Sequence, residues 1–116
     1  MVFNGNYLTY FDIAVTELWR DAIGGWNEIA NEGVDAVVAE ATVRYLSPLR
    51  FDDEFELLAT VGKLGDSSMI VELAIERDAE RCAEGEIRYV FIEPGSSTKA
   101  RIPDSLRKAL EPYAAV

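Results

Sequence analysis

The feature that most constrains the fold of this chain is a change in hydrophobic period along the sequence. Residues 7–22 carry one broad apolar stripe with steps of three and four residues, and this period predicts an amphipathic helix. Between residues 37 and 92, apolar and polar side chains instead alternate in four segments, and this period predicts strands. Gly24 is expected to end the helix, and Pro48 is expected to end the first strand.

These predicted elements define an α+β fold. A further short helix is expected from Pro103. A long helix with a broad apolar face is expected to lie across an antiparallel sheet of four hairpin-linked strands in meander order. The length predicts a single domain over residues 1–116. Such a sheet has unpaired edges, so pairing with a second copy of the chain is expected to cover them.

Composition argues against several function classes. Eleven Lys and Arg residues against 21 Asp and Glu residues give a net charge of −10, which argues against nucleic-acid binding. The absence of histidine excludes Ser-His-Asp and Cys-His catalysis and every His-ligated zinc site, and no metal is expected. Cys82 is the single cysteine and is expected to be a small strand residue rather than a nucleophile. No apolar run approaches the roughly 18 residues of a membrane span and no signal-peptide pattern is present, so a cytoplasmic protein is expected.

Four motifs resemble those of a known family in their order and spacing. They are Val2-Phe3-Asn4-Gly5-Asn6-Tyr7-Leu8-Thr9-Tyr10-Phe11-Asp12, Phe51-Asp52-Asp53 after Pro48, Gly65-Asp66-Ser67-Ser68, and Ile102-Pro103-Asp104-Ser105-Leu106-Arg107. Over essentially its whole length, the chain resembles the hotdog-fold thioesterases, in particular the acyl-CoA thioesterase branch with 4-hydroxybenzoyl-CoA thioesterase and the Tol-Pal-associated thioesterase. The resemblance implies a hotdog fold, in which an antiparallel sheet wraps a long helix, and hydrolysis of acyl-CoA or related thioesters to free acid and thiol. It also implies a homodimer or homotetramer with the pocket between subunits, and no cofactor, because coenzyme A is part of the substrate.

The resemblance also implies a first strand and a leading Asp-x-Asp-x-x-Gly segment, whose carboxylate acts in the family as nucleophile or general base. In the family both precede the Val-aromatic pair, whereas this sequence has Val2-Phe3 directly after Met1. We therefore expect a hotdog fold without the first family strand. Two explanations for the difference are open at this point: the start site lies too far downstream, or the chain is a shortened relative of the family. The alternative function is a non-catalytic hotdog protein that binds acyl groups; a hotdog dehydratase is a weaker alternative, since it usually needs an Asp–His pair.

The resemblance places the candidate catalytic residues at the start of the long helix. Backbone N–H groups at a helix N-terminus are aimed at negative charge, so Asn4 and Gly5 are expected to form the turn that stabilises the oxyanion of an attacked thioester. Gly5 allows close approach of the backbone to a ligand. An ordinary helix cap is the alternative for both residues. Asp12 is the nearest carboxylate on the helix and the candidate catalytic carboxylate; its alternative is a solvated residue or a partner of Arg20.

Other residues are candidates for substrate binding. Asn6 and Tyr7 follow the oxyanion turn, and Tyr7 is expected either to line an acyl pocket or to belong to the core. Ser67 and Ser68 fall at the strand-to-strand turn that lies near coenzyme A in the family, with an ordinary turn as the alternative. Four cations are candidates for the phosphates of coenzyme A, with dispersed surface charge as the alternative: Lys63, Arg88, Lys99 and Arg101.

Overall fold

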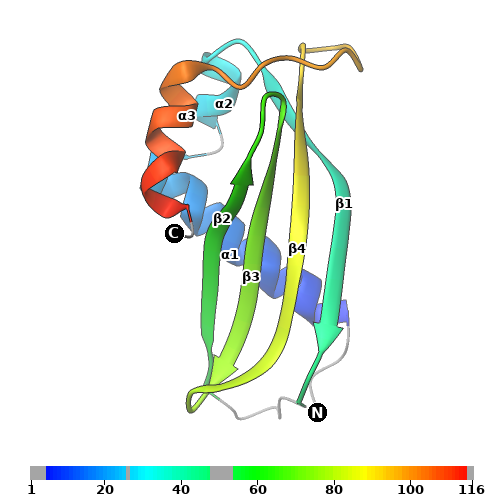
Figure 1. The fold of residues 1–116 in the computed structure, drawn as a ribbon, viewed down its shortest axis with the longest axis vertical. Helices are drawn as coiled ribbons and strands as arrows, with labels where there is room; N and C mark the ends of the chain where they lie inside the picture. Colours follow the sequence, from blue (N-terminus) through cyan, green and yellow to red (C-terminus); the bar gives the residue numbers. More distant parts are fainter. Residues whose placement is uncertain (1–4, 26, 48–53, 115–116) are drawn as a thin grey trace.

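A computed structural model of the chain describes residues 5–25, 27–47 and 54–114. The helices are α1 (Gly5–Ile23), α2 (Asn27–Asn31), α3 (Asp104–Leu110) and the 3₁₀ turn η1 (Glu111–Tyr113), and the strands are β1 (Asp35–Tyr45), β2 (Glu56–Leu64), β3 (Ser68–Arg77) and β4 (Glu80–Ile92) (Figure 1). The predicted order of a long helix, four strands and a short helix is confirmed. α2 is an additional helix between α1 and β1, and its single buried residue, Ile29, is too little for a periodic signal.

α1 forms where the helical period predicts it. Its buried side chains recur every three to four residues, and they are Tyr7, Phe11, Ala14, Val15, Leu18 and Trp19. Gly24 and Gly25 end the helix with φ angles of 90° and 132°, which side chains other than glycine rarely adopt. Their N–H groups donate to the carbonyls of Arg20 and Trp19, at 3.1 and 3.2 Å, so the helix end is closed by its own backbone.

The sheet is antiparallel, but its strand order, β1-β4-β3-β2, differs from the predicted meander. β2, β3 and β4 follow one another as predicted, whereas β1 pairs with β4, from Asp35 opposite Ile92 to Tyr45 opposite Ala83. β1 and β2 therefore lie at opposite edges of the sheet, three strand spacings or about 14 Å apart. The predicted meander order was wrong because the alternation of apolar and polar residues identifies a strand but does not show which strands lie next to it.

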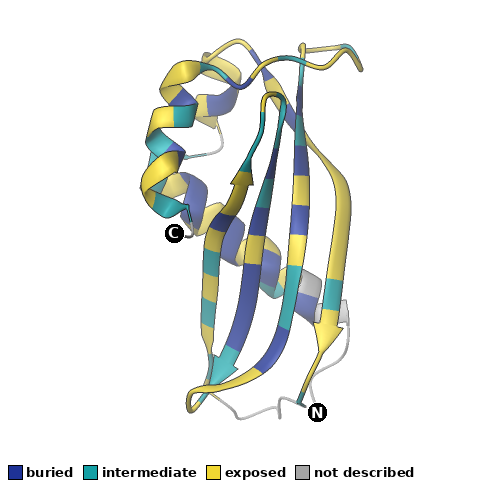
Figure 2. Ribbon diagram, in the orientation of Figure 1, coloured by how far each residue is buried: buried dark blue, intermediate teal, exposed yellow. Residues whose placement is uncertain are grey.

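α1 lies across one face of the sheet, which we call the inward face (Figure 1). The register places Met69, Val71, Leu73 and Ile75 of β3 on this face, and all four are buried. The intervening residues of β3 and β4 point outward and include many charged side chains. Figure 2 shows the resulting mixture of buried and exposed positions along both strands.

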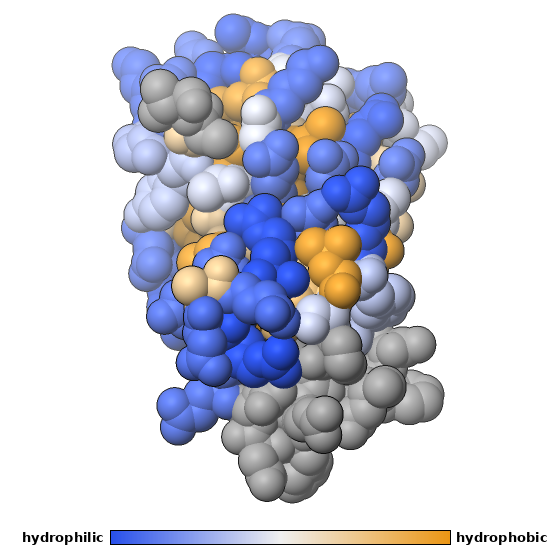
Figure 3. Space-filling view, turned by 60° about the horizontal axis from the view of Figure 1, so that its bottom comes forward, coloured by the Kyte–Doolittle hydropathy of each residue, from blue (hydrophilic) through white to orange (hydrophobic). Residues whose placement is uncertain are grey.

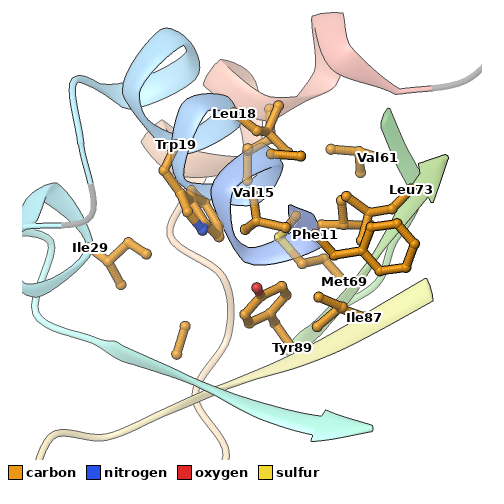
Figure 4. Close-up of a cluster of buried hydrophobic side chains, with 14 of the residues drawn as sticks. Phe11, Val15, Leu18, Trp19, Ile29, Val61, Met69, Leu73, Ile87 and Tyr89 are labelled. Carbon is orange, nitrogen blue, oxygen red and sulfur yellow. The ribbon is translucent and has the colours of Figure 1, made fainter. Parts of the chain in front are cut away.

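The core fills the space between α1 and the inward face. Figure 4 shows side chains of α1 and of the sheet directed at one another, among them Phe11, Val15, Leu18, Val61, Met69 and Leu73. Gly85 of β4 permits this close packing. A Cβ there would lie 2.8 Å from Cε2 of Phe11 and would overlap the carbonyl oxygen of Thr42.

α3 contacts α1 and begins directly after Pro103, as the sequence predicts. Leu106 and Leu110 are its buried residues. Among the described helices, none combines the length and apolar character needed to cross a bilayer.

Candidate active site

The first turn of α1 is the first part of the candidate site. α1 begins at Gly5, and the first four N–H groups of a helix have no acceptor within the helix. Here these groups belong to Gly5, Asn6, Tyr7 and Leu8, so backbone donors and the positive end of the helix dipole coincide at this point. Asn6 lies inside the first turn rather than before it. Asn4, the predicted partner of Gly5, lies outside the described residues.

Tyr7 is a buried aromatic residue of this turn, with 3% of its surface exposed. Its ring centroid lies 4.9 Å from that of Tyr45, at the end of β1, and 6.5 Å from that of Tyr10. The ring of Tyr10 in turn lies 4.9 Å from that of Phe55, just before β2. Aromatic contacts therefore hold the start of α1 against both edge strands. Tyr7 packs as a core side chain, and its contact with an acyl group stays a prediction.

Asp12 lies about two turns further along α1. A spacing of seven residues returns to within about 20° of the starting direction, so Asp12 and Gly5 share one face of the helix, about 10 Å apart along the axis. The Asp12 side chain is exposed and makes no ion pair with a described residue. Arg20, the partner considered for it, pairs with Glu17 at 2.8 Å.

The negative charge of Asp12 acts on Tyr89 of β4. Burial first, and the negative charge of Asp12 second, raise the pKa of Tyr89 to about 12. Val38 of β1 lies opposite Tyr89 in the register and so shares the inward face, yet it is 55% exposed. At Val38 the inward face of β1 is therefore not covered by α1.

Ser67 and Ser68 lie at the turn between β2 and β3. The carbonyl of Ser67 accepts the N–H of Phe91 at 2.7 Å, and the carbonyl of Ser68 accepts that of Gly65 at 2.8 Å. Figure 1 places this turn at the top of the sheet, whereas α1 begins beside the lower part of β1. A single chain therefore does not bring the two serines to the start of α1.

Three of the four candidate cations share the end of the sheet that carries this turn. Lys63 of β2 and Arg88 of β4 stand opposite Ile70 of β3 on either side, so both point to the outward face. Lys99 pairs with Ile92, at the same end of β4. None of these three cations makes an ion pair within the described part of the chain. The sheet thus gathers cations that are dispersed in the sequence.

Arg101, the fourth candidate, is held in ion pairs with Asp66 at 3.4 Å and Asp104 at 3.5 Å. Close by, Nη2 of Arg107 donates to the carbonyl of Gly65 at 2.7 Å. The sequence assigns Arg107 no role, because its partner lies 42 residues earlier and no spacing rule connects the two.

A hollow of about 440 Å³ lies on the outward face, away from the predicted site residues. Ion pairs of Arg44 and Arg81 with Glu84 cross it, the latter at 3.2 Å. Its paired charges make it unsuited to an acyl group. Figure 3, which brings the lower end of the molecule forward, shows a mostly hydrophilic surface over the described residues.

Metal and cysteine chemistry find no support in the described residues. Within them, no three His, Cys, Asp or Glu side chains are grouped so that they could hold a metal ion. Cys82 is a free, buried residue of β4, as the sequence predicts. That the reaction needs no cofactor stays a prediction.

A long helix that lies across an antiparallel sheet is the architecture of a hotdog-fold protein, as the sequence predicts. The chain belongs to the thioesterase-like superfamily, whose family model matches residues 1–110. The 4-hydroxybenzoyl-CoA or Tol-Pal-associated branch stays a prediction within this family.

Relatives with a named activity or a solved structure are similar to this chain. Acyl-CoA thioester hydrolase YbgC of Escherichia coli O6:H1 is 24% identical over 107 residues, which are 91% of this chain and 80% of the relative. The PA5185 protein of Pseudomonas aeruginosa is 32% identical with a TM-score of 0.80, covering 98% of this chain and 80% of that one. A thioesterase of Thermus thermophilus, solved with coenzyme A and Zn, is 27% identical with a TM-score of 0.82, covering 97% and 80%.

Proposed function

We propose that this chain hydrolyses acyl-CoA thioesters to a free acid and coenzyme A. The observation that carries the proposal is the position of Asp12, an exposed carboxylate on the helix face that begins with Gly5, in a chain of the thioesterase-like superfamily. The activity named for the Escherichia coli relative and the coenzyme A in the Thermus thermophilus structure support the same substrate class.

The distance between Gly5 and Asp12 decides the role of Asp12. A nucleophile must lie about 3 Å from the carbonyl carbon whose oxygen accepts the helix amides, and a separation of about 10 Å along the helix is too long for that. A general base acts through a water molecule, which adds about 3 Å of reach. The side chain of Asp12 also leans toward the start of its helix. Asp12 therefore activates water in the proposed mechanism.

In this mechanism the water oxygen attacks the thioester carbonyl carbon while Asp12 takes a proton from the water. The carbonyl oxygen becomes an oxyanion, which the N–H groups of Gly5 and Asn6 stabilise. The C–S bond then breaks, and the leaving thiolate takes the proton back from Asp12. One C–O bond has formed, one C–S bond has broken, and the products are the acid and the thiol.

We further propose a homodimer joined along β1, or a dimer of such dimers. β1 is an edge strand, and exposed apolar side chains lie on or next to it: Val37, Val38, Tyr45 and Leu46. If two β1 strands paired antiparallel, the end of β1 in one subunit would lie against the start of β1 in the other subunit. In each subunit the end of β1 lies beside the start of α1. The start of β1 and the β2–β3 turn lie at the same end of the sheet (Figure 1), so the turn of one subunit would approach Asp12 of the other.

The phosphates of coenzyme A are proposed to bind near this turn. Ser67 and Ser68 supply hydroxyl groups there, and Lys63, Arg88 and Lys99 supply positive charge. In a chain with a net charge of −10, a polyanion needs such a local concentration of cations.

Release of free thiol from short, long and aromatic acyl-CoAs tests the proposed activity. We expect hydrolysis by the wild type and a fall in kcat of about 10²- to 10³-fold in Asp12→Asn, because a general base contributes about 10²- to 10⁴-fold. Asp21→Asn removes an exposed carboxylate from the same helix and is the matched control, with kcat expected to stay within about twofold.

The outcomes separate the candidate functions. Background release from every acyl-CoA, together with acyl-CoA binding in calorimetry, would favour the non-catalytic acyl-binding protein. Equal loss of kcat in Asp12→Asn and Asp21→Asn would exclude Asp12 as the base. A preference for aromatic acyl groups would support the 4-hydroxybenzoyl-CoA branch.

A further inference from the structure

The turn between β2 and β3 is fixed by a segment from the far end of the chain. The N–H of Ile102 donates to the carbonyl of Asp66 at 2.8 Å. Nη2 of Arg107 donates to the carbonyl of Gly65 at 2.7 Å and lies 3.5 Å from the carbonyl oxygen of Asp66. Arg101 adds an ion pair to the Asp66 carboxylate at 3.4 Å. Residues 101–107 therefore hold the turn by backbone, guanidinium and carboxylate contacts at once.

Arg107 is an unusual member of this set. It is half-buried, and its Nε is a buried donor without a hydrogen-bond partner in the described part of the chain. Its hydrogen bonds go to carbonyl oxygens, and no carboxylate of the described residues forms an ion pair with it. A buried donor without a hydrogen-bond partner costs free energy, so a role of Arg107 in the structure alone does not account for its position.

The guanidinium is suited to this contact in a way that a lysine ammonium is not. One nitrogen, Nη2, makes both contacts, and it belongs to a rigid planar group that fixes the direction of its N–H bonds. The ammonium of a lysine is a compact point charge on a flexible stem. The uncompensated positive charge also lies beside the turn that carries Ser67 and Ser68. Arg107 thus sets both the shape of the turn and the local field.

We propose that Arg107 is a positioning residue that holds the Gly65–Ser68 turn in the conformation that binds the nucleotide part of coenzyme A. This inference rests on the proposed function for its ligand. Arg107 acts through the turn, so it affects substrates that reach the turn and leaves the chemistry at Asp12 unchanged.

Kinetics with two matched substrates test the proposal. Arg107→Lys is expected to raise the KM for an acyl-CoA about tenfold, the equivalent of one lost hydrogen bond to a charged group, with kcat within about twofold. The KM for the pantetheine thioester of the same acyl group, which lacks the nucleotide, is expected to stay within about twofold. Lys108→Gln removes a neighbouring positive charge from the same helix and is expected to leave both KM values unchanged. A merely structural role of Arg107 would affect both substrates alike.

Hydrogen exchange gives a second readout that does not need turnover. Arg107→Lys is expected to speed exchange at the amides of Gly65 and Ile102, and coenzyme A is expected to slow exchange at the same amides in the wild type. If Arg107→Lys does not fold, hydrogen exchange of the wild type with and without coenzyme A tests the inference. Binding of coenzyme A without slower exchange at these amides would overturn the inference, as would an unchanged KM for acyl-CoA in the folded variant. A wild type that neither binds coenzyme A nor hydrolyses its thioesters would instead overturn the proposed function.

Discussion

At the scale of single residues, the charges of the sheet are ordered by partners that are distant in sequence. Glu84 of β4 pairs with Arg44 of β1 and with Arg81, which also contacts Glu76 of β3 at 3.1 Å. Hydrogen bonds from Arg44 first and Arg81 second hold the pKa of Glu84 below its usual value of 4.5. The lowered pKa means that the folded chain favours the ionised carboxylate more than the unfolded chain does.

The stability of the protein should therefore depend on Glu84 in acid. A carboxyl group with a lowered pKa in the folded state stabilises the fold above its unfolded pKa, and this contribution is lost as the pH falls through the folded pKa. Between about pH 6 and about pH 3, we expect the unfolding free energy of Glu84→Gln to fall less than that of the wild type. Urea titrations at several pH values measure this difference. Glu86→Gln, on the same strand and face, is the control and should follow the wild type; identical pH curves for all three proteins would contradict the assignment.

At the scale of elements, the distance between α1 and the sheet depends on Gly85. Phe11 is fully buried, and its ring lies where a side chain at position 85 would stand. The sequence shows a glycine within a predicted strand but does not show which ring needs the space. The helical stripe that contains Phe11 was predictable, because helical period is local, whereas the contact between Phe11 and Gly85 joins two elements.

Gly85→Ala should destabilise the protein by about 1–3 kcal/mol, the usual cost of overpacking, because the new Cβ would meet the backbone of Thr42 and the ring of Phe11. Thermal or urea unfolding measures the change. Gly62→Ala on β2 is the matched control. Its Cβ would also come within 2.7 Å of another atom, but that atom belongs to the flexible side chain of Glu72, which can move aside. We expect a change within about 0.5 kcal/mol there. Equal effects of the two substitutions would argue against close packing at Gly85.

At the scale of the whole molecule, one chain holds the parts of the proposed site at separate ends. The start of α1 lies beside the lower part of β1, and the turn between β2 and β3 lies at the other end of the sheet (Figure 1). The two edges of the sheet also differ, because β1 carries more exposed apolar surface than β2, where Leu58 is exposed. Both features favour association through β1, which would bring the separated parts together.

Val38→Lys should therefore yield a monomer, because a charge would lie within the proposed β1 interface, and acyl-CoA hydrolysis should fall with it. Light scattering coupled to size-exclusion chromatography measures the mass of the particle. Leu58→Lys places the same charge on the opposite edge strand and is expected to leave the dimer intact. A monomeric wild type, or a dimer that survives Val38→Lys but not Leu58→Lys, would contradict association through β1.

Local patterns in the amino-acid sequence were enough to predict the helix at residues 7–22, the four strands, the turn at Ser67 and the resemblance to the thioesterases, which the family match bears out. The pairing of β1 with β4 and the contact of Arg107 with Gly65 became visible only in the folded chain. The same holds for the separation of the start of α1 from the turn between β2 and β3 (Figure 1). These features depend on contacts between segments tens of residues apart. Local periodicity and turn chemistry do not encode which distant segments meet, because that choice is made by the packing of the folded chain as a whole.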